Sequence, residues 1–152
     1  MTKAVAIDTN LLVLLVVGMT DPDYIKRHRR LHPTYKSRHF DLVREILIRA
    51  PKVICTAHIL AEASNLLRQI GDPMRSEIMA TYRLFIQSAD EPLIPAKQAS
   101  QSLSFIRLGL TDAAMLSLDP TDVLLLTVDH DLHIASSERG FEVLNLTSYL
   151  YE

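Results

Sequence analysis

The sequence predicts an α/β protein, more specifically a three-layer α/β/α sandwich with a mostly parallel central sheet. Short runs of consecutive apolar residues, as at 4–7 and 123–127, alternate with longer segments of helical spacing. Runs without a polar face are typical of strands covered on both sides, and their alternation with helices is typical of parallel sheets. No repeat, low-complexity tract or linker divides the 152 residues. We therefore expect a single domain over 1–152.

The first strand is expected at residues 4–7, where it ends at the polar residues 8–10. Residues 11–17 are apolar throughout and predict a buried helix. The segment 18–35 is polar and contains Pro22 and Pro33, so it predicts a loop that can include a helical turn.

The middle of the chain predicts one strand between helices. Apolar residues at 40, 43, 46 and 47 predict a helix over 40–48, and residues 52–55 predict the second strand. Thr56 is a suitable N-cap for a helix from 57 to about 70, which Gly71 closes. Asp72 and Pro73 then open a further helix, which ends before Pro92.

The last third of the chain predicts two more strands. We expect a helix over 98–108, an interruption at Gly109, and a short helix through 118 with Thr111 as its cap. The remaining expected elements are a strand at 123–127, a helix at 131–138 and a strand at 142–146.

Composition excludes several classes of protein. The formal net charge is −2, so the chain has no uniformly cationic coat and would have to meet a polyanion with a local basic patch. The single cysteine, Cys55, excludes a disulfide framework and a cysteine-rich metal site. The uninterrupted apolar run near the N-terminus, 11–17, is too short for a membrane span or a signal sequence. We expect a soluble, cytoplasmic, unprocessed protein.

Four acidic residues fall where a ligand site is expected. In parallel α/β sheets, ligands bind at the carboxyl ends of the strands. Asp8 follows the first strand and Asp129 follows the strand at 123–127, while Asp112 and Glu62 lie on helices between strands. Crowded carboxylates repel one another unless a cation joins them, and Mg²⁺ or Mn²⁺ prefers such oxygen ligands. The pattern therefore predicts a divalent-metal site without His or Cys ligands.

Each acidic residue alone also has an ordinary structural explanation. Asp8 could simply end a strand, Asp112 suits the positive end of a helix dipole, and Asp129 could form a turn or a cap. Glu62 is harder to explain in this way, because its neighbours on the helix are apolar and a buried, unpaired Glu is rare.

The motifs around these residues resemble those of PIN-domain nucleases over nearly the whole chain. They are Ile-Asp-Thr-Asn-Leu-Leu at 7–12, His-Ile-Leu-Ala-Glu-Ala-Ser-Asn at 58–65, Leu-Thr-Asp-Ala at 110–113 and Leu-Thr-Val-Asp-His-Asp-Leu at 126–132. Stand-alone members of this size are often VapC-like toxins of toxin–antitoxin pairs. The segment 18–39 is longer here than in many of those toxins.

The resemblance implies a PIN-like fold, a role for each motif residue and a set of partners. Asp8, Glu62, Asp112 and Asp129 would be the catalytic residues that hold Mg²⁺ or Mn²⁺. Asn10 and Thr127 would position a carboxylate or water, and Asp131 matches an accessory acidic position. The implied activity is hydrolysis of RNA by a metal-activated water, which leaves a 5′-phosphate and a 3′-hydroxyl. The implied partners are an RNA substrate, an antitoxin and a second copy of the chain.

A basic segment at about 18–39 supplies the local positive patch. It holds six of the sixteen lysines and arginines, which we assign to nucleic-acid binding: Lys26, Arg27, Arg29, Arg30, Lys36 and Arg38. Tyr24 and Tyr35 are interleaved and could stack on bases. A solvated loop or a surface for an acidic partner is the alternative. His28 and His32 have the spacing of a metal pair, but so many neighbouring cations disfavour it.

Three other hypotheses remain at this point. A non-catalytic PIN-fold RNA-binding module, or a PIN nuclease in RNA processing or defence, would keep the fold without the toxin role. A haloacid-dehalogenase-type phosphatase needs an Asp where Asn10 stands, which disfavours it. Phe85, Ile86, Phe105 and Ile106 could form a dimer face or belong to the core.

Overall fold

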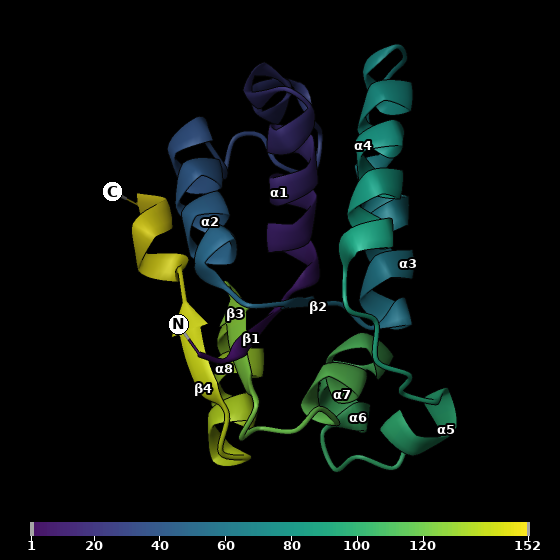
Figure 1. The fold of residues 1–152 in the computed structure, drawn as a ribbon, viewed down its shortest axis with the longest axis vertical. Coiled ribbons are helices and arrows are strands. Elements are labelled where there is room, and N and C mark those ends of the chain that lie inside the picture. Colours follow the sequence, from purple (N-terminus) through teal and green to yellow (C-terminus); the bar gives the residue numbers. More distant parts are fainter. Residues whose placement is uncertain (1, 152) are drawn as a thin grey trace.

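The computed structural model describes residues 2–151 and contains one four-stranded, all-parallel sheet in the order β2-β1-β3-β4 (Figure 1). The strands are β1 Ala4–Ile7, β2 Val53–Ile54, β3 Val123–Thr127 and β4 Glu142–Asn145. The central pair is β1 and β3, which runs from Ala4 opposite Val123 to Ile7 opposite Leu126. All five residues of β3 are buried. The predicted α/β fold with a parallel sheet is confirmed.

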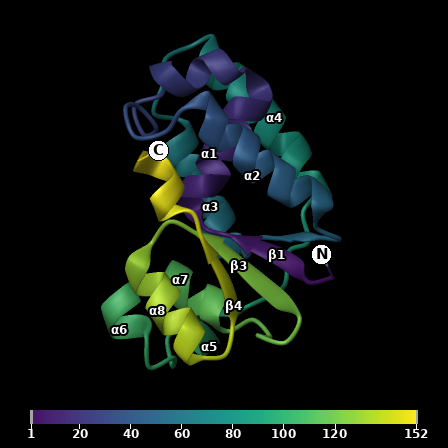
Figure 2. The same ribbon diagram turned by 90° about the vertical axis from the view of Figure 1, so that its left-hand side faces the viewer.

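Helices cover both faces of the sheet (Figure 2). One layer contains α1 Thr9–Thr20, α2 Ser37–Arg49, α3 Ala57–Leu67 and α4 Met74–Ser88. The other contains α5 Ala96–Ala99, α6 Phe105–Leu108, α7 Leu110–Leu116 and α8 His130–Glu138. Two 3₁₀ helices complete the described elements, η1 Pro22–Arg27 and η2 Thr147–Tyr151.

Helix α1 lies at the centre of its layer, where it contacts α2, α3, α4 and η1. Its residues are apolar on every side, which is the pattern of a fully surrounded helix. Gly18 permits the close approach of α2, because a Cβ at this position would lie 2.2 Å from the ring of Phe40. The helix extends three residues beyond the predicted 11–17, and η1 is the helical turn that the expected loop at 18–35 could include.

Two sequence predictions in the second layer are wrong. The helix predicted over 98–108 is interrupted between α5 and α6. Serine hydroxyls there bond to the local backbone, as in the bond from the Ser100 hydroxyl to the Lys97 carbonyl, and this competes with helix formation. Thr111 does not cap α7 either. Gly109, at a φ of 88°, precedes the helix, and Thr111 lies inside it.

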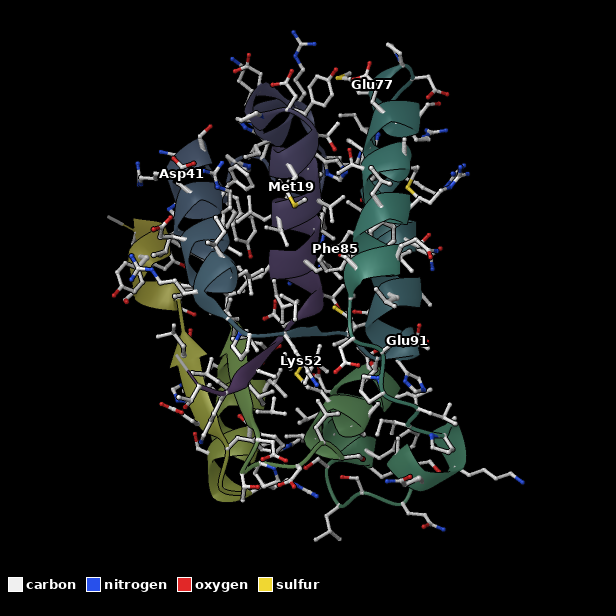
Figure 3. All side chains as sticks on the ribbon, viewed as in Figure 1. Met19, Asp41, Lys52, Glu77, Phe85 and Glu91 are labelled. Carbon is white, nitrogen blue, oxygen red and sulfur yellow. The ribbon has the colours of Figure 1, made fainter. Side chains whose placement is uncertain are left out.

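The four residues considered for a dimer face do not form one exposed surface. Phe85 is buried, Ile86 and Phe105 are half-buried, and only Ile106 is exposed. A separate apolar groove of about 320 Å³ lies between α1, α2 and α4, and Met19 and Phe85 both line it (Figure 3).

Within residues 2–151, no helix is long and apolar enough to cross a membrane.

The order of the strands reverses direction at β1. The chain passes from β1 to β2 on one side and returns to place β3 on the other side of β1. The carboxyl ends of β1 and β3 are therefore adjacent, but the chain continues from β1 to β2 on one side and from β3 to β4 on the other. This is the position at which open α/β sheets form binding crevices.

Candidate active site

Asp8 is fixed at the carboxyl end of β1 by three hydrogen bonds. Its Oδ1 accepts the Leu11 amide at 3.0 Å and so caps α1, while its Oδ2 accepts the Thr127 hydroxyl at 2.6 Å and the Val128 amide at 2.9 Å. The side chain is buried. Burial raises the pKa of Asp8 above its usual value, although the three hydrogen bonds oppose the shift.

Thr127 joins the ends of the two central strands. Its hydroxyl donates to Asp8 and accepts the Asp129 amide at 2.9 Å. Asp129 in turn caps α8 by accepting the Leu132 amide on Oδ1 at 2.9 Å, and its side chain is exposed. Thr127 thus fixes the distance between the backbones that carry two of the predicted site residues.

The other two acidic residues come from α3 and α7. Thr111 donates its hydroxyl to Glu62 Oε2 at 2.8 Å, so the bond ties one helix to the other. Glu62 is exposed, which corrects the expectation that it lies buried on the apolar face of its helix. Asp112 is half-buried in the first turn of α7, as predicted.

All four predicted carboxylates line one small cavity of about 110 Å³ at this edge of the sheet. Its lining residues are Asp8, Thr9, Asn10, Glu62, Asp112, Asp129 and Leu132. Asp131 is exposed in the first turn of α8 and is not part of the lining. Residues more than 100 positions apart in the sequence therefore line the same cavity.

The carboxylates of this acidic cavity repel one another. Burial raises the pKa of Asp112 to about 7, and the charges of Asp129, Asp8 and Glu62 add to the shift. A cation among these groups would remove the repulsion and favour their ionised forms.

The donor set suits a hard divalent cation, because the cavity lining has four carboxylates and neither His nor Cys. Within residues 2–151, however, no group of three or more His, Cys, Asp or Glu side chains is arranged to hold a metal ion as it stands. Binding an ion here would therefore require the side chains to close around it. The exposed Glu62 and Asp129 have the room to do so, whereas Asp8 is fixed.

One residue of the basic segment reaches the cavity wall. Arg30 donates from Nε and Nη2 to Asn10 Oδ1, at 3.3 and 3.1 Å, and Asn10 lines the acidic cavity. The six predicted nucleic-acid-binding residues are all exposed, and Lys26 and Lys36 line a neighbouring hollow of about 530 Å³ together with His32 and Tyr35. The segment therefore lies beside the acidic cavity.

Two buried histidines anchor the basic segment. His28 accepts the Arg30 amide on Nδ1 at 3.1 Å and donates from Nε2 to the Leu67 carbonyl at 3.0 Å. His39 is bound in the same way, with the Lys36 amide on Nδ1 at 2.9 Å and the Tyr149 carbonyl at 3.1 Å from Nε2. Burial lowers the pKa of both rings, so both are neutral near pH 7.

The interleaved tyrosines do not offer free faces for bases. Tyr35 is buried, and burial raises the pKa of its hydroxyl to about 12, with the charge of Asp8 adding to the shift. Tyr24 is half-buried, and its hydroxyl donates to Glu77 on α4. The expectation that both stack on unpaired bases is corrected by the burial of Tyr35.

The sequence-based reasoning did not identify the anchoring histidines or the contact between Arg30 and Asn10. One signal was present. Ile25, His28, Leu31 and Tyr35 are all buried and recur at intervals of three, three and four residues, a spacing that indicates one packed face. Arginines and lysines lie between these positions, so the segment as a whole has the composition of an exposed loop.

No family model matches the chain, and no curated protein or solved structure matches it closely enough to identify a relative. The chemistry of the site is therefore inferred from its own residues.

Proposed function

We propose that the protein is a Mg²⁺- or Mn²⁺-dependent endoribonuclease of the PIN-domain type. The observation that carries the proposal is the acidic cavity, into which four carboxylates from separate elements converge at the crevice between β1 and β3. Burial, together with the charges of the other three carboxylates, raises the pKa of Asp112 to about 7, and a divalent cation bound there would favour the ionised form. The motif resemblance at 7–12, 58–65, 110–113 and 126–132 supports the same assignment.

A nucleic acid is the proposed substrate because a cationic segment adjoins the acidic cavity, and the motif resemblance points to RNA. A phosphodiester needs positive charge along its backbone and an electrophilic centre at the bond to be cleaved. The exposed lysines and arginines of 26–38 supply the first, and a metal held by Asp8, Glu62, Asp112 and Asp129 would supply the second.

Asp8 and Glu62 have distinct tasks in this proposal. Asp8 is a rigid ligand, because Thr127, Val128 and Leu11 fix both of its oxygens. Glu62 is oriented by Thr111 from the facing helix. When bound, a divalent ion would lower the pKa of a water molecule and offset charge on the leaving oxygen. Addition of the water oxygen to phosphorus, with cleavage of the P–O3′ bond and protonation of O3′, would leave a 5′-phosphate and a 3′-hydroxyl.

A toxin role, with an antitoxin and a second copy of the chain as partners, stays a prediction that rests on the motif resemblance alone. An RNA-processing or defence nuclease would have the same site.

The test is incubation of the purified protein with total RNA and with single-stranded DNA, in Mg²⁺, Mn²⁺ or EDTA. Asp112→Asn is the inactivating variant, and Asp41→Asn is its matched control, because Asp41 is an exposed carboxylate on α2 that does not line the cavity. We expect metal-dependent cleavage of RNA by the wild type and by Asp41→Asn, and none by Asp112→Asn.

Cleavage retained by Asp112→Asn would remove the site assignment. Stronger cleavage of DNA than of RNA would change the substrate class. RNA binding without turnover under either metal would favour the non-catalytic RNA-binding module.

A further inference from the structure

We propose that Arg30 binds a phosphate of the RNA directly beside the acidic cavity, and that the other basic residues bind the strand further away. This inference rests on the proposed function and adds to it a residue that contacts the substrate at the cleaved bond. Of the six exposed cations in the basic segment, Arg30 is the one whose side chain is bonded to a residue of the cavity lining.

The contact with Asn10 orients the guanidinium without neutralising its charge. Nε and Nη2 share one neutral acceptor, Asn10 Oδ1, and a guanidinium has five N–H groups in a rigid plane. Three N–H groups are therefore left for another acceptor. Among the described residues, the ion pairs join Lys3 to Glu142, Arg49 to Glu45 and Lys52 to Asp90, and none involves Arg30.

The backbone of Arg30 is also fixed. Its amide donates to the imidazole of His28, which is fully buried and donates in turn to the Leu67 carbonyl at the end of α3. The neighbouring Arg29 amide donates to the Gln69 carbonyl at 3.4 Å. Because α3 also carries Glu62, the position of Arg30 is coupled to the helix that supplies one of the carboxylates.

A phosphodiester oxygen is the ligand that this arrangement suits. A carboxylate-lined cavity repels an RNA phosphate, so a cation at its rim is needed to hold the phosphate close to the bound metal. Guanidinium N–H groups match phosphate oxygens in spacing and plane, and charge-assisted bonds of this type are stronger than neutral ones.

The experiment compares Arg30→Ala, Arg30→Lys and Arg30→Gln with Arg49→Ala, a matched control that removes an exposed arginine of α2 outside the basic segment and the acidic cavity. We expect Arg30→Ala to lower kcat/KM for a short RNA about 10- to 100-fold, the size expected for a lost hydrogen bond to a charged group. Arg30→Lys should recover only part of the loss, because ammonium lacks the planar fork. Arg49→Ala should change kcat/KM about 2-fold or less.

A double-mutant cycle tests the contact that holds Arg30. Asn10→Ala should lower activity less than Arg30→Ala, and the double variant should lose no more than Arg30→Ala alone, because the two residues act through one contact. Thermal unfolding of all variants should stay near the wild type, since Arg30 is exposed. Losses that follow unfolding instead would assign Arg30 a structural role and overturn the inference.

The outcomes separate the two proposals. If the wild type cleaves RNA and Arg30→Ala matches Arg49→Ala, the inference on Arg30 fails while the nuclease stands. If the wild type does not cleave, the proposed function fails, and RNA affinity in Mg²⁺ is measured instead. Equal affinities for Arg30→Ala and Arg49→Ala would then overturn the inference as well.

Discussion

At the scale of single residues, the four carboxylates of the acidic cavity differ in how they are held. Asp8, Glu62 and Asp129 each accept at least one hydrogen bond from a neighbour. Within residues 2–151, no hydrogen bond reaches the Asp112 side chain, and its raised pKa reflects burial and repulsion alone. Substitution of the four residues by Asn or Gln should therefore have opposite effects on stability at different positions.

Asp112→Asn should stabilise the metal-free protein at neutral and alkaline pH. The folded pKa of about 7 lies above the ordinary value of 3.8, so the wild type loses stability as the pH rises toward and through 7. Asparagine cannot ionise and avoids this loss. We expect a higher Tm for the variant at pH 8 in EDTA, with a difference that shrinks toward pH 4; each kcal/mol corresponds to about 2–4 °C. A Tm difference that does not vary with pH would contradict this.

Asp8→Asn should destabilise the fold. An amide can keep the bond from Leu11 but places an N–H group where Oδ2 accepts the Val128 amide. The mismatch should cost about 1–3 kcal/mol, the usual penalty for an unsatisfied buried group. Urea denaturation measures it, with Asp41→Asn as the control. Equal stability of Asp8→Asn and the wild type would show that the cap and the strand connection contribute little.

The positions of the site residues were predictable from sequence, but their environments were not. Asp8 and Asp129 follow apolar runs, and parallel strands place such residues at one edge. The apolar neighbours of Glu62 predict a buried side chain, yet Glu62 is exposed and accepts a hydrogen bond from Thr111. The contact between Arg30 and Asn10 spans twenty residues and depends on how the basic segment packs, which no local pattern encodes.

At the scale of elements, the basic segment is held by two neutral imidazoles. His28 and His39 each accept a backbone N–H on Nδ1 and donate from Nε2 to a carbonyl distant in the sequence. Protonation of either ring would place a hydrogen on Nδ1 against the bound amide. The attachment of the segment is therefore sensitive to pH.

We expect the protein to lose stability as the pH falls below about 6.5. The folded pKa of both rings is lowered from 6.5 by burial, so the unfolded chain binds protons more readily and stability is gained as the pH rises. The contribution is complete above about 6.5 and lost below it. His28→Gln should flatten this fall in Tm between pH 7 and 5, while the exposed His32→Gln should leave it unchanged. An unchanged slope in His28→Gln would contradict the assignment.

Lys26 and Lys36 should contribute affinity rather than turnover. Both are exposed around the 530 Å³ hollow beside Tyr35. Replacement of both by Ala should reduce the salt dependence of RNA binding by about 1.4 in log–log slope, at about 0.7 per contact with a single strand. Turnover at saturating RNA should be retained. Arg49→Ala with Lys52→Ala is the control, because these residues lie near the start of β2, at the other end of the sheet. Equal slopes in the two double variants would place the RNA elsewhere.

The sequence predicted elements best where packing and local signals agree. Thr56 caps α3 as expected, by accepting the Ile59 amide at 3.3 Å, and the strand at 123–127 has the predicted bounds. The prediction failed over 98–108, where the hydroxyls of Ser100 and Ser102 form local hydrogen bonds, and over 18–20, where tertiary contacts extend α1 past its predicted end. Such contacts override propensity and leave little trace in composition.

At the scale of the whole molecule, opposite charges are separated rather than neutralised. Although the net charge is only −2, the protein has an acidic cavity and a basic segment, which meet at the contact between Asn10 and Arg30. Both lie near the reversal in strand order between β1 and β3. In the proposed nuclease, the basic segment would attract a polyanion to the acidic cavity, although the protein as a whole would repel it weakly.

The double use of Asp8 has an evolutionary consequence. Its carboxylate closes the first helix and links two strands, so selection for a folded protein alone would retain it. Asp112 has no such second task. If the protein is the proposed nuclease, lineages that abandon hydrolysis should accumulate substitutions first at Asp112, while Asp8 and Thr127 persist. A descendant with Asp8 intact is therefore weak evidence of a working enzyme, and the residue at position 112 is the more informative one to inspect.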